Sequence, residues 1–199
     1  MLSTLLAGFG LSFSAGLNAY LPLLILALVD RFTDVVELDQ PYDILSSNLG
    51  LIILLVILPI ELIPDKISRI DHLNDLLHTA IRPIAGAILF MAYASQEGDL
   101  HPVVAMVIGL LIAGGVHAIK SSNRPHISQM TRGVGNPFIS ILEDAVSIGV
   151  AILAIFVPVS VLFALPLAIW LVLRAYRRMR SGETRLMALV GTQAPPAQE

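Results

Sequence analysis

The chain has 199 residues, of which 56% are hydrophobic and 14% are charged, and this composition excludes an ordinary water-soluble domain. The formal net charge of -3 leaves no basic surface to hold a nucleic-acid backbone, so nucleic-acid binding is excluded as a main activity. Because the chain has no cysteine, disulfide bridges, thiolate metal sites and a cysteine nucleophile are excluded as well.

Six apolar runs are candidate transmembrane helices, because about 18 apolar residues cross a hydrocarbon core of roughly 30 Å. In chain order they are residues 3–29, 44–63, 80–94, 102–119, 137–157 and 159–176. The third run is short, and we expect the helical residues before it to extend it. Only Pro158 separates the last two runs, which predicts a tight hairpin. The sequence thus predicts an all-α, polytopic membrane bundle of about six segments over residues 1–180, followed by a disordered cytoplasmic tail over 181–199.

The positions of the basic residues predict an orientation. With this segmentation every Lys and Arg except Arg31 falls on one side, which the positive-inside rule assigns to the cytoplasm. Both termini are therefore expected to be cytoplasmic, in a bacterial inner membrane, with the acidic loop 30–43 outside. A cleaved signal peptide is the alternative for the first run, but this run lacks a basic start and exceeds the usual length.

Two pairs of segments suggest an internal repeat. They are residues 10–19 with 109–118, and residues 83–93 with 166–176. Three segments in each half would make the second half enter the membrane in the opposite sense, as in many secondary transporters. The prediction is a 3+3 inverted repeat with halves 1–97 and 100–180.

Small residues predict interrupted helices at corresponding places of the two halves. Residues 8–16 are rich in Gly and Ser and are followed by Asn18, while Gly114 and Gly115 lie in the fourth run. An unwound backbone can offer free N–H and C=O groups to a substrate. The alternative is that small residues only let two helices approach closely.

Polar residues near the cytoplasmic ends of the apolar runs are the candidate substrate-binding or ion-binding residues, because a charge at the bilayer centre costs roughly 2.5–3.5 kcal/mol. They are Glu61, Asp65, Lys66, His117, Lys120, Glu143 and Asp144, together with Asn18, which lies deeper, near the middle of the first run. We expect them to line a polar cavity open to the cytoplasm, with the adjacent Glu143 and Asp144 as the candidate site of a coupled proton. Simple structural pairing of Glu61 and Lys120 is the alternative.

Residues 63–83 have apolar positions spaced by three and four, which predicts an interfacial amphipathic helix. Asp71, Asp75 and His78 share one face of it and could hold a divalent cation, form a proton relay, or simply face solvent. Arg82 and Arg124 are candidates to contact an anionic headgroup or phosphate, although positive charge that only sets the topology is an equal alternative for the loop after Lys120.

Several of these motifs together resemble domain-of-unknown-function family 4126, a family of small bacterial membrane proteins. The motifs are residues 14–24, 61–67, 71–75, 81–86, 117–120 and 143–144. The resemblance covers about residues 8–158 and implies an integral membrane protein with polar motifs at these positions. It brings no established activity with it.

Three function classes follow from the residues. The first is a small transporter or carrier with a cytoplasm-facing site for an ion, a proton or a small anionic or headgroup substrate. The second is a membrane-embedded enzyme that uses Mg²⁺ on a phosphorylated lipid, and the third is a non-catalytic scaffold. Membrane lipids are the expected partners, and a homo-oligomer is compatible with the sequence. A divalent cation or a coupled proton is the candidate cofactor.

Overall fold

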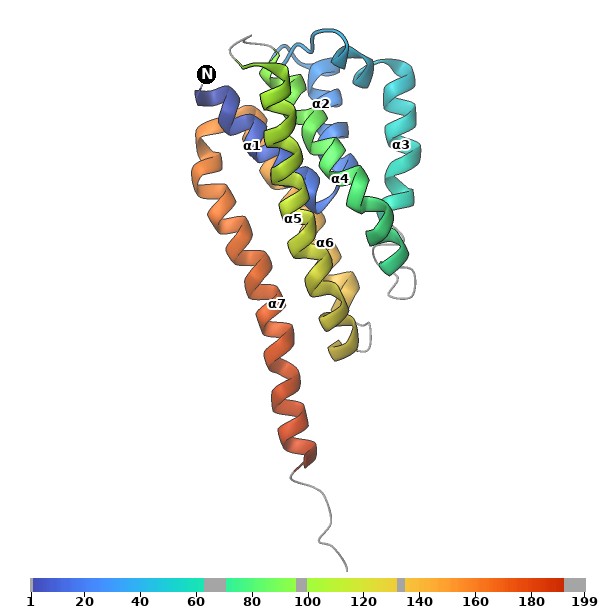
Figure 1. Cartoon of the computed structure of the whole chain (residues 1–199), viewed down its shortest axis with the longest axis vertical. Helices are drawn as coiled ribbons and strands as arrows, with labels where there is room; N and C mark the ends of the chain where they lie inside the picture. The colour runs from blue at the N-terminus through green and yellow to red at the C-terminus, as the bar shows by residue number, and fades with distance from the viewer. Residues whose placement is uncertain (1, 63–70, 96–99, 132–134, 192–199) are drawn as a thin grey trace, which may run out of the picture.

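The computed structural model describes residues 2–62, 71–95, 100–131 and 135–191, and these ranges contain helices and loops with no strand. The helices are α1 (Leu2–Leu17), α2 (Tyr20–Phe32), α3 (Asn48–Leu62), α4 (Asp71–Ala94), α5 (Pro102–Thr131), α6 (Gly135–Phe156) and α7 (Val161–Gly191). The short 3-10 turns η1 (Tyr42–Leu45) and η3 (Pro158–Ser160) lie before α3 and α7. Figure 1 shows the helices side by side in one elongated bundle.

The bundle has the apolar length that a membrane protein needs. Parts of α4, α5, α6 and α7 are long and apolar enough to cross a membrane, and α1 and α3 are shorter apolar helices. Large aliphatic and aromatic side chains on the outside of these helices are exposed, as expected where the solvent is lipid. The protein is therefore an all-helical membrane bundle.

The first apolar run turns back on itself instead of crossing the bundle. α1 begins beside the α4–α5 connection, where Leu5 packs on Phe90 and Ala94, and runs inward to Leu17. α2 then returns toward the same end (Figure 1), so that Leu6 of α1 and Leu26 of α2 belong to one core cluster.

This turn corrects the prediction that residues 3–29 form one crossing segment. Two half-length helices satisfy their backbone internally except at the break, and each is too short to span roughly 30 Å. As a result, the beginning of α1 and the end of α7 lie at opposite ends of the bundle, whereas the sequence predicted both termini on one side.

The break predicted for the fourth run is absent, because α5 is one continuous helix through Gly114 and Gly115. Glycine weakens a helix by only about 1 kcal/mol, which packing readily offsets. The close approach that small residues allow occurs elsewhere: a Cβ on Gly109 would collide with the carbonyl oxygen of Gly86 on α4, and one on Gly16 would lie 2.7 Å from the carbonyl oxygen of Ala113. The inverted repeat stays a prediction.

The remaining helices and connections match the sequence prediction or are longer than predicted. α6 and α7 form the predicted hairpin through η3. From Asp71 onward the amphipathic segment and the third apolar run form the single helix α4, while residues 63–70 of that segment lie outside the described residues. α7 continues to Gly191, past the predicted start of the tail, and residues 192–199 lie outside the described residues.

α3 is the most peripheral helix of the bundle. It packs along α2, antiparallel to it, at the edge visible in Figure 1. Among its fifteen residues only Leu54 and Glu61 are buried. A helix that is otherwise exposed to lipid therefore brings one carboxylate into the interior.

Candidate functional site

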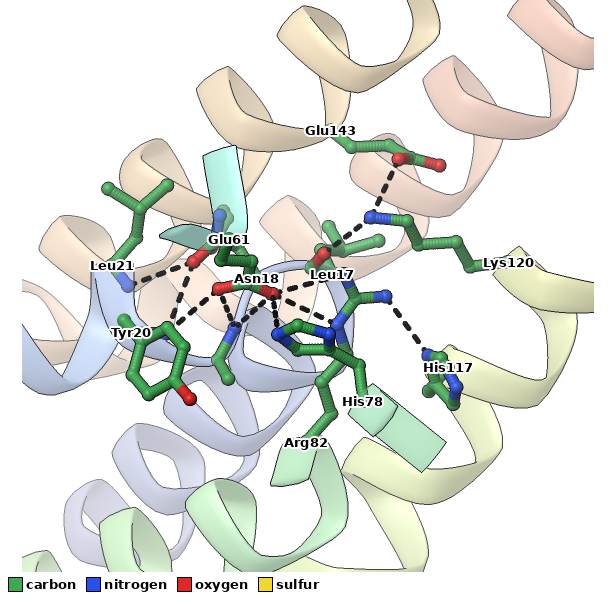
Figure 2. Close-up of polar contacts among 12 residues, drawn as sticks. Leu17, Asn18, Tyr20, Leu21, Glu61, His78, Arg82, His117, Lys120 and Glu143 are labelled. Carbon is green, nitrogen blue, oxygen red and sulfur yellow. Dashed lines mark hydrogen bonds and ion pairs between the residues drawn. The ribbon is translucent and has the colours of Figure 1, made fainter. Parts of the chain in front are cut away.

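The break between α1 and α2 leaves backbone groups without helical partners, and polar side chains hold them. The side-chain oxygen of Asn18 accepts hydrogen bonds from the backbone N–H groups of Tyr20 and Leu21, at 3.1 and 3.0 Å, and thereby caps α2. The carboxylate of Glu61 accepts from the N–H groups of Ala19 and Tyr20 at 3.2–3.4 Å. An anion thus sits at the positive end of the α2 dipole (Figure 2).

Glu61 is also the centre of a buried ion pair. The Nε and Nη2 atoms of Arg82 donate to its Oε1 atom at 3.2 and 3.0 Å, and both side chains are fully enclosed. His78 lies with its Nε2 atom 3.4 Å from the same oxygen. Since a buried charge without a partner is strongly unfavourable, these contacts make the carboxylate on α3 and the guanidinium on α4 depend on each other.

Arg82 extends this cluster to α5. Its Nη1 atom lies 3.0 Å from Nδ1 of His117, and because a guanidinium can only donate, Nδ1 accepts. The hydrogen is therefore on Nε2, which lies 3.2 Å from the hydroxyl of Thr79. The network fixes the tautomer of His117.

The other end of the break is held by a cation. Lys120 on α5 donates from Nζ to the carbonyl oxygen of Leu17, the last residue of α1, at 2.8 Å. A positive group at the C-terminal end of a helix is the favourable arrangement for its dipole. The same Nζ lies 3.0 Å from Oε2 of Glu143 on α6 (Figure 2).

Glu143 forms the second charged centre. Arg124 also donates to its Oε2 atom, at 3.0 Å, and the hydroxyl of Tyr176 on α7 donates to Oε1. Two cations therefore surround one fully buried carboxylate. The amide of Asn18 donates to Asp144 at 3.1 Å, which connects this centre to the break.

The network is off-centre along the bundle. At 1.5 Å per residue, Tyr176 lies roughly 22 Å along α7 from its start and Lys120 roughly 27 Å along α5. The hydrocarbon core is about 30 Å thick. The charged centres therefore lie near the far ends of the apolar spans of α5 and α7, on the side away from the start of α1.

The structure brings most of the candidate residues into this one network. Among the described side chains these are Asn18, Glu61, His78, Arg82, His117, Lys120, Arg124, Glu143 and Asp144. Arg82 and Arg124, predicted to contact an external anion, each contact a carboxylate of the chain itself. Asp65 and Lys66 lie outside the described residues, as do the side chains of Asp71 and Asp75.

Two features differ from the expected open cavity. Glu61 and Glu143 both point inward, but they are packed against cations. A cavity of about 160 Å³ touches Lys120 and Glu143, while Glu61 is not part of its lining. Within the described part of the chain no three His, Asp or Glu residues form a group that could hold a metal ion, and the set of Asp71, Asp75 and His78 stays a prediction.

Sequence reasoning missed the groups that carry no charge. The backbone N–H groups of Ala19 and Tyr20 could have been found only from the exact position of the break. Tyr176 carried a signal, since it is the last residue of the predicted sixth apolar run, a common place for an amphipathic aromatic residue. Ser14 and Ser147 bind each other at 2.8 Å between hydroxyl oxygens and join α1 to α6.

Comparisons with known proteins place the chain in a family. No curated protein and no solved structure matches it. One family model, described as "Domain of unknown function (DUF4126)", matches residues 5–178. These residues make up most of the chain and include the charged centres around Glu61 and Glu143. They also contain the motifs on which the family resemblance rests. The protein belongs to the DUF4126 family.

Proposed function

We propose that the protein is a small membrane carrier for an anionic substrate, and that the substrate binds at the Asn18–Ala19 break. One observation carries this proposal: both free backbone ends of a broken helix are held by charged side chains of other helices. Glu61 holds the start of α2 and Lys120 holds the end of α1. Discontinuous helices whose ends face a charged group near the membrane interior are typical of secondary transporters.

The chemistry of the break favours an anion. Among the described residues, the Glu61 carboxylate contacts two backbone N–H groups, the guanidinium of Arg82 and the imidazole of His78. A carboxylate or phosphate oxygen of a substrate would make the same bonds. Glu61 therefore acts as an internal occupant that a substrate would replace.

Access would come from a movement of α3. This helix is held to the bundle by α2 and by the buried residues Leu54 and Glu61. Withdrawal of Glu61 would expose Arg82 and the start of α2 without disturbing the packing of α1 on α4 and α6. The free-energy cost of separating Glu61 from Arg82 would be offset by the bonds of the arriving anion to Arg82. Movement of α3 would therefore be strictly coupled to binding of the substrate.

The orientation is also part of the proposal. The basic residues gather at the end of the bundle where α5 carries Lys120 and Arg124 and α7 carries Arg174. The positive-inside rule assigns this end to the cytoplasm of a bacterial inner membrane. The start of α1 and the α2–α3 loop would then face outward, and the network would lie nearer the cytoplasm.

Binding of an anion at the break is tested by removing the Glu61 carboxylate. In the purified Glu61→Ala variant, acetate or inorganic phosphate should raise the melting temperature, because ligand bound only to the folded state stabilises it by about 2.7 kcal/mol at a hundredfold excess over Kd. Chloride at the same ionic strength should have a much smaller effect. The matched control is Glu37→Gln in the exposed loop, whose melting temperature should not respond to acetate.

Transport is tested with the wild-type chain in liposomes. Uptake of labelled phosphate and succinate, and transbilayer movement of fluorescent phosphatidylglycerol, are compared with empty liposomes. Movement of at least one probe, lost in the Arg82→Gln variant and retained in Glu37→Gln, is the expected result. If none of the three moves faster than in empty liposomes, the carrier proposal is wrong and a scaffold becomes the better interpretation.

A further inference from the structure

The apolar cavity beside the second charged centre has a polar end and an apolar end. It lies between α1, α5 and α7, with a volume of about 160 Å³. Phe13, Val116 and Ile169 belong to its apolar walls, and Lys120 and Tyr176 lie at its polar end. The apolar walls lie toward the middle of the bundle from these polar groups, because Phe13 and Ile169 each precede the polar level by about one to two helical turns.

A basic groove adjoins this cavity. The groove has a volume of about 530 Å³ and shares the side chains of Ile169 and Leu173 with the cavity. Its other walls include Trp170, Arg174 and Arg178, all exposed on α7. The Arg174 guanidinium carbon lies 4.6 Å from the centre of the Trp170 ring, which holds both side chains at the rim.

The charge of this rim is not balanced within its own helix. Over the whole of α7 (Val161–Gly191) the sequence has five arginines and one acidic residue, Glu183, which lies past the rim. At roughly 1.5 Å per residue, Arg174 and Arg178 lie about 20–26 Å along α7, at the depth where headgroups meet the hydrocarbon core. Arginines beside an apolar cavity at this depth match a molecule with a phosphate at one end and a hydrocarbon chain at the other.

We propose that an anionic phospholipid binds along α7, with its phosphate on Arg174 and Arg178 and part of one acyl chain in the cavity between α1, α5 and α7. The positions of the charges and of the apolar walls give the lipid one direction, with its headgroup at the basic end of the bundle. Such a site can be detected without transport, so its test is separate from that of the carrier.

The single tryptophan of the chain reports on this site. Trp170 lines the groove and is half-exposed, so a brominated acyl chain bound there would quench its fluorescence. The full chain is reconstituted into mixtures of phosphatidylglycerol and phosphatidylcholine in which one lipid or the other is brominated. At about 1 kcal/mol per arginine, two arginines predict a binding constant for phosphatidylglycerol about 30 times that for phosphatidylcholine at low salt.

Three variants make the result specific. Arg178→Gln should reduce the preference severalfold. Ile169→Phe fills the cavity without changing the charge, so it should lower the quenching by brominated phosphatidylglycerol and by brominated phosphatidylcholine alike. Arg31→Gln, in the last turn of α2, should leave both the preference and the quenching unchanged. Equal quenching of the wild type by the two brominated lipids, or an unchanged preference in Arg178→Gln together with unchanged quenching in Ile169→Phe, would show only ordinary surrounding lipid and would overturn the proposal.

Discussion

Replacing Glu61 should destabilise the protein far more than replacing any exposed carboxylate, because Glu61 holds both a buried cation and the start of α2. In the Glu61→Leu variant Arg82 loses its counter-charge inside the bundle, where it is fully enclosed. Removing one partner of such a pair costs about 3–5 kcal/mol. The N–H group of Ala19 loses its acceptor too, which adds about 1–3 kcal/mol for an unsatisfied group, whereas the N–H of Tyr20 keeps Asn18 as its acceptor.

The charge contribution can be separated with a double variant. Glu61→Leu with Arg82→Met removes both charges and leaves only the unsatisfied N–H group of Ala19, so it should recover most of the 3–5 kcal/mol. For a chain of this size 1 kcal/mol corresponds to about 2–4 °C, so the double variant should melt about 6–20 °C above Glu61→Leu alone.

The assay is thermal unfolding in dodecyl maltoside, followed by far-ultraviolet circular dichroism. Glu37→Gln in the exposed loop serves as the control and should melt within about 2 °C of the wild type, as expected for a surface substitution. If the double variant melts at or below Glu61→Leu, the two side chains do not depend on each other, and the description of the break given above is wrong.

Two further predictions concern the fold. On this cysteine-free background, Ser3→Cys and Asp39→Cys should be labelled by an impermeant maleimide from the same side of the membrane, and Ser122→Cys from the opposite side. If Ser3→Cys and Ser122→Cys are instead labelled from the same side, the first run crosses the membrane once. Gly109→Ala should lower the free energy of unfolding by about 1–3 kcal/mol, because its Cβ collides with α4. Gly115→Ala should be neutral or slightly stabilising, because its Cβ meets no heavy atom within 4 Å beyond the adjacent backbone of its own helix. Equal unfolding curves for the two variants would contradict the close packing of α4 on α5.

The membrane bundle and most of its helices could be predicted, because hydrocarbon leaves the backbone few choices. Every buried N–H and C=O group must find a partner, so a long apolar run becomes a helix. The hairpin before α7 followed from Pro158 between two such runs, and the structure confirms it. The extension of the third run through Leu77 into α4 followed from its continuous helical spacing.

The direction of the chain after the first break could not be predicted by composition. Residues 3–29 are apolar throughout, and the hydropathy of a crossing helix is the same as that of two half-length helices that turn back. The length of the run did indicate a turn, since residues 3–29 exceed the roughly 20 residues that one span needs. The weakness of this run as a continuous helix was predicted from its small residues and Asn18, and α1 ends at Leu17, immediately before Asn18.

The break predicted at Gly114 and Gly115, which α5 does not have, shows what the sequence prediction lacked. Small residues permit an interruption but do not require one, and Gly114 and Gly115 lie inside the continuous helix α5. At the true break, Glu61 and Lys120 reach it from 42 and 103 residues away in the chain. The contacts that decide between helix and break are therefore long-range, and periodicity in one segment does not contain them.

The break and the charges explain each other's presence in the membrane. An unpaired helix end in hydrocarbon costs several kcal/mol for each exposed group, and a single charge costs a comparable amount. At the Asn18–Ala19 break, the carboxylate of Glu61 meets the positive end of α2 and the ammonium of Lys120 meets the negative end of α1, so each removes the other's penalty. The sequence showed both kinds of unfavourable group at similar depth. Their mutual compensation at one point is the reason that a bundle this small can keep a helix broken inside a membrane.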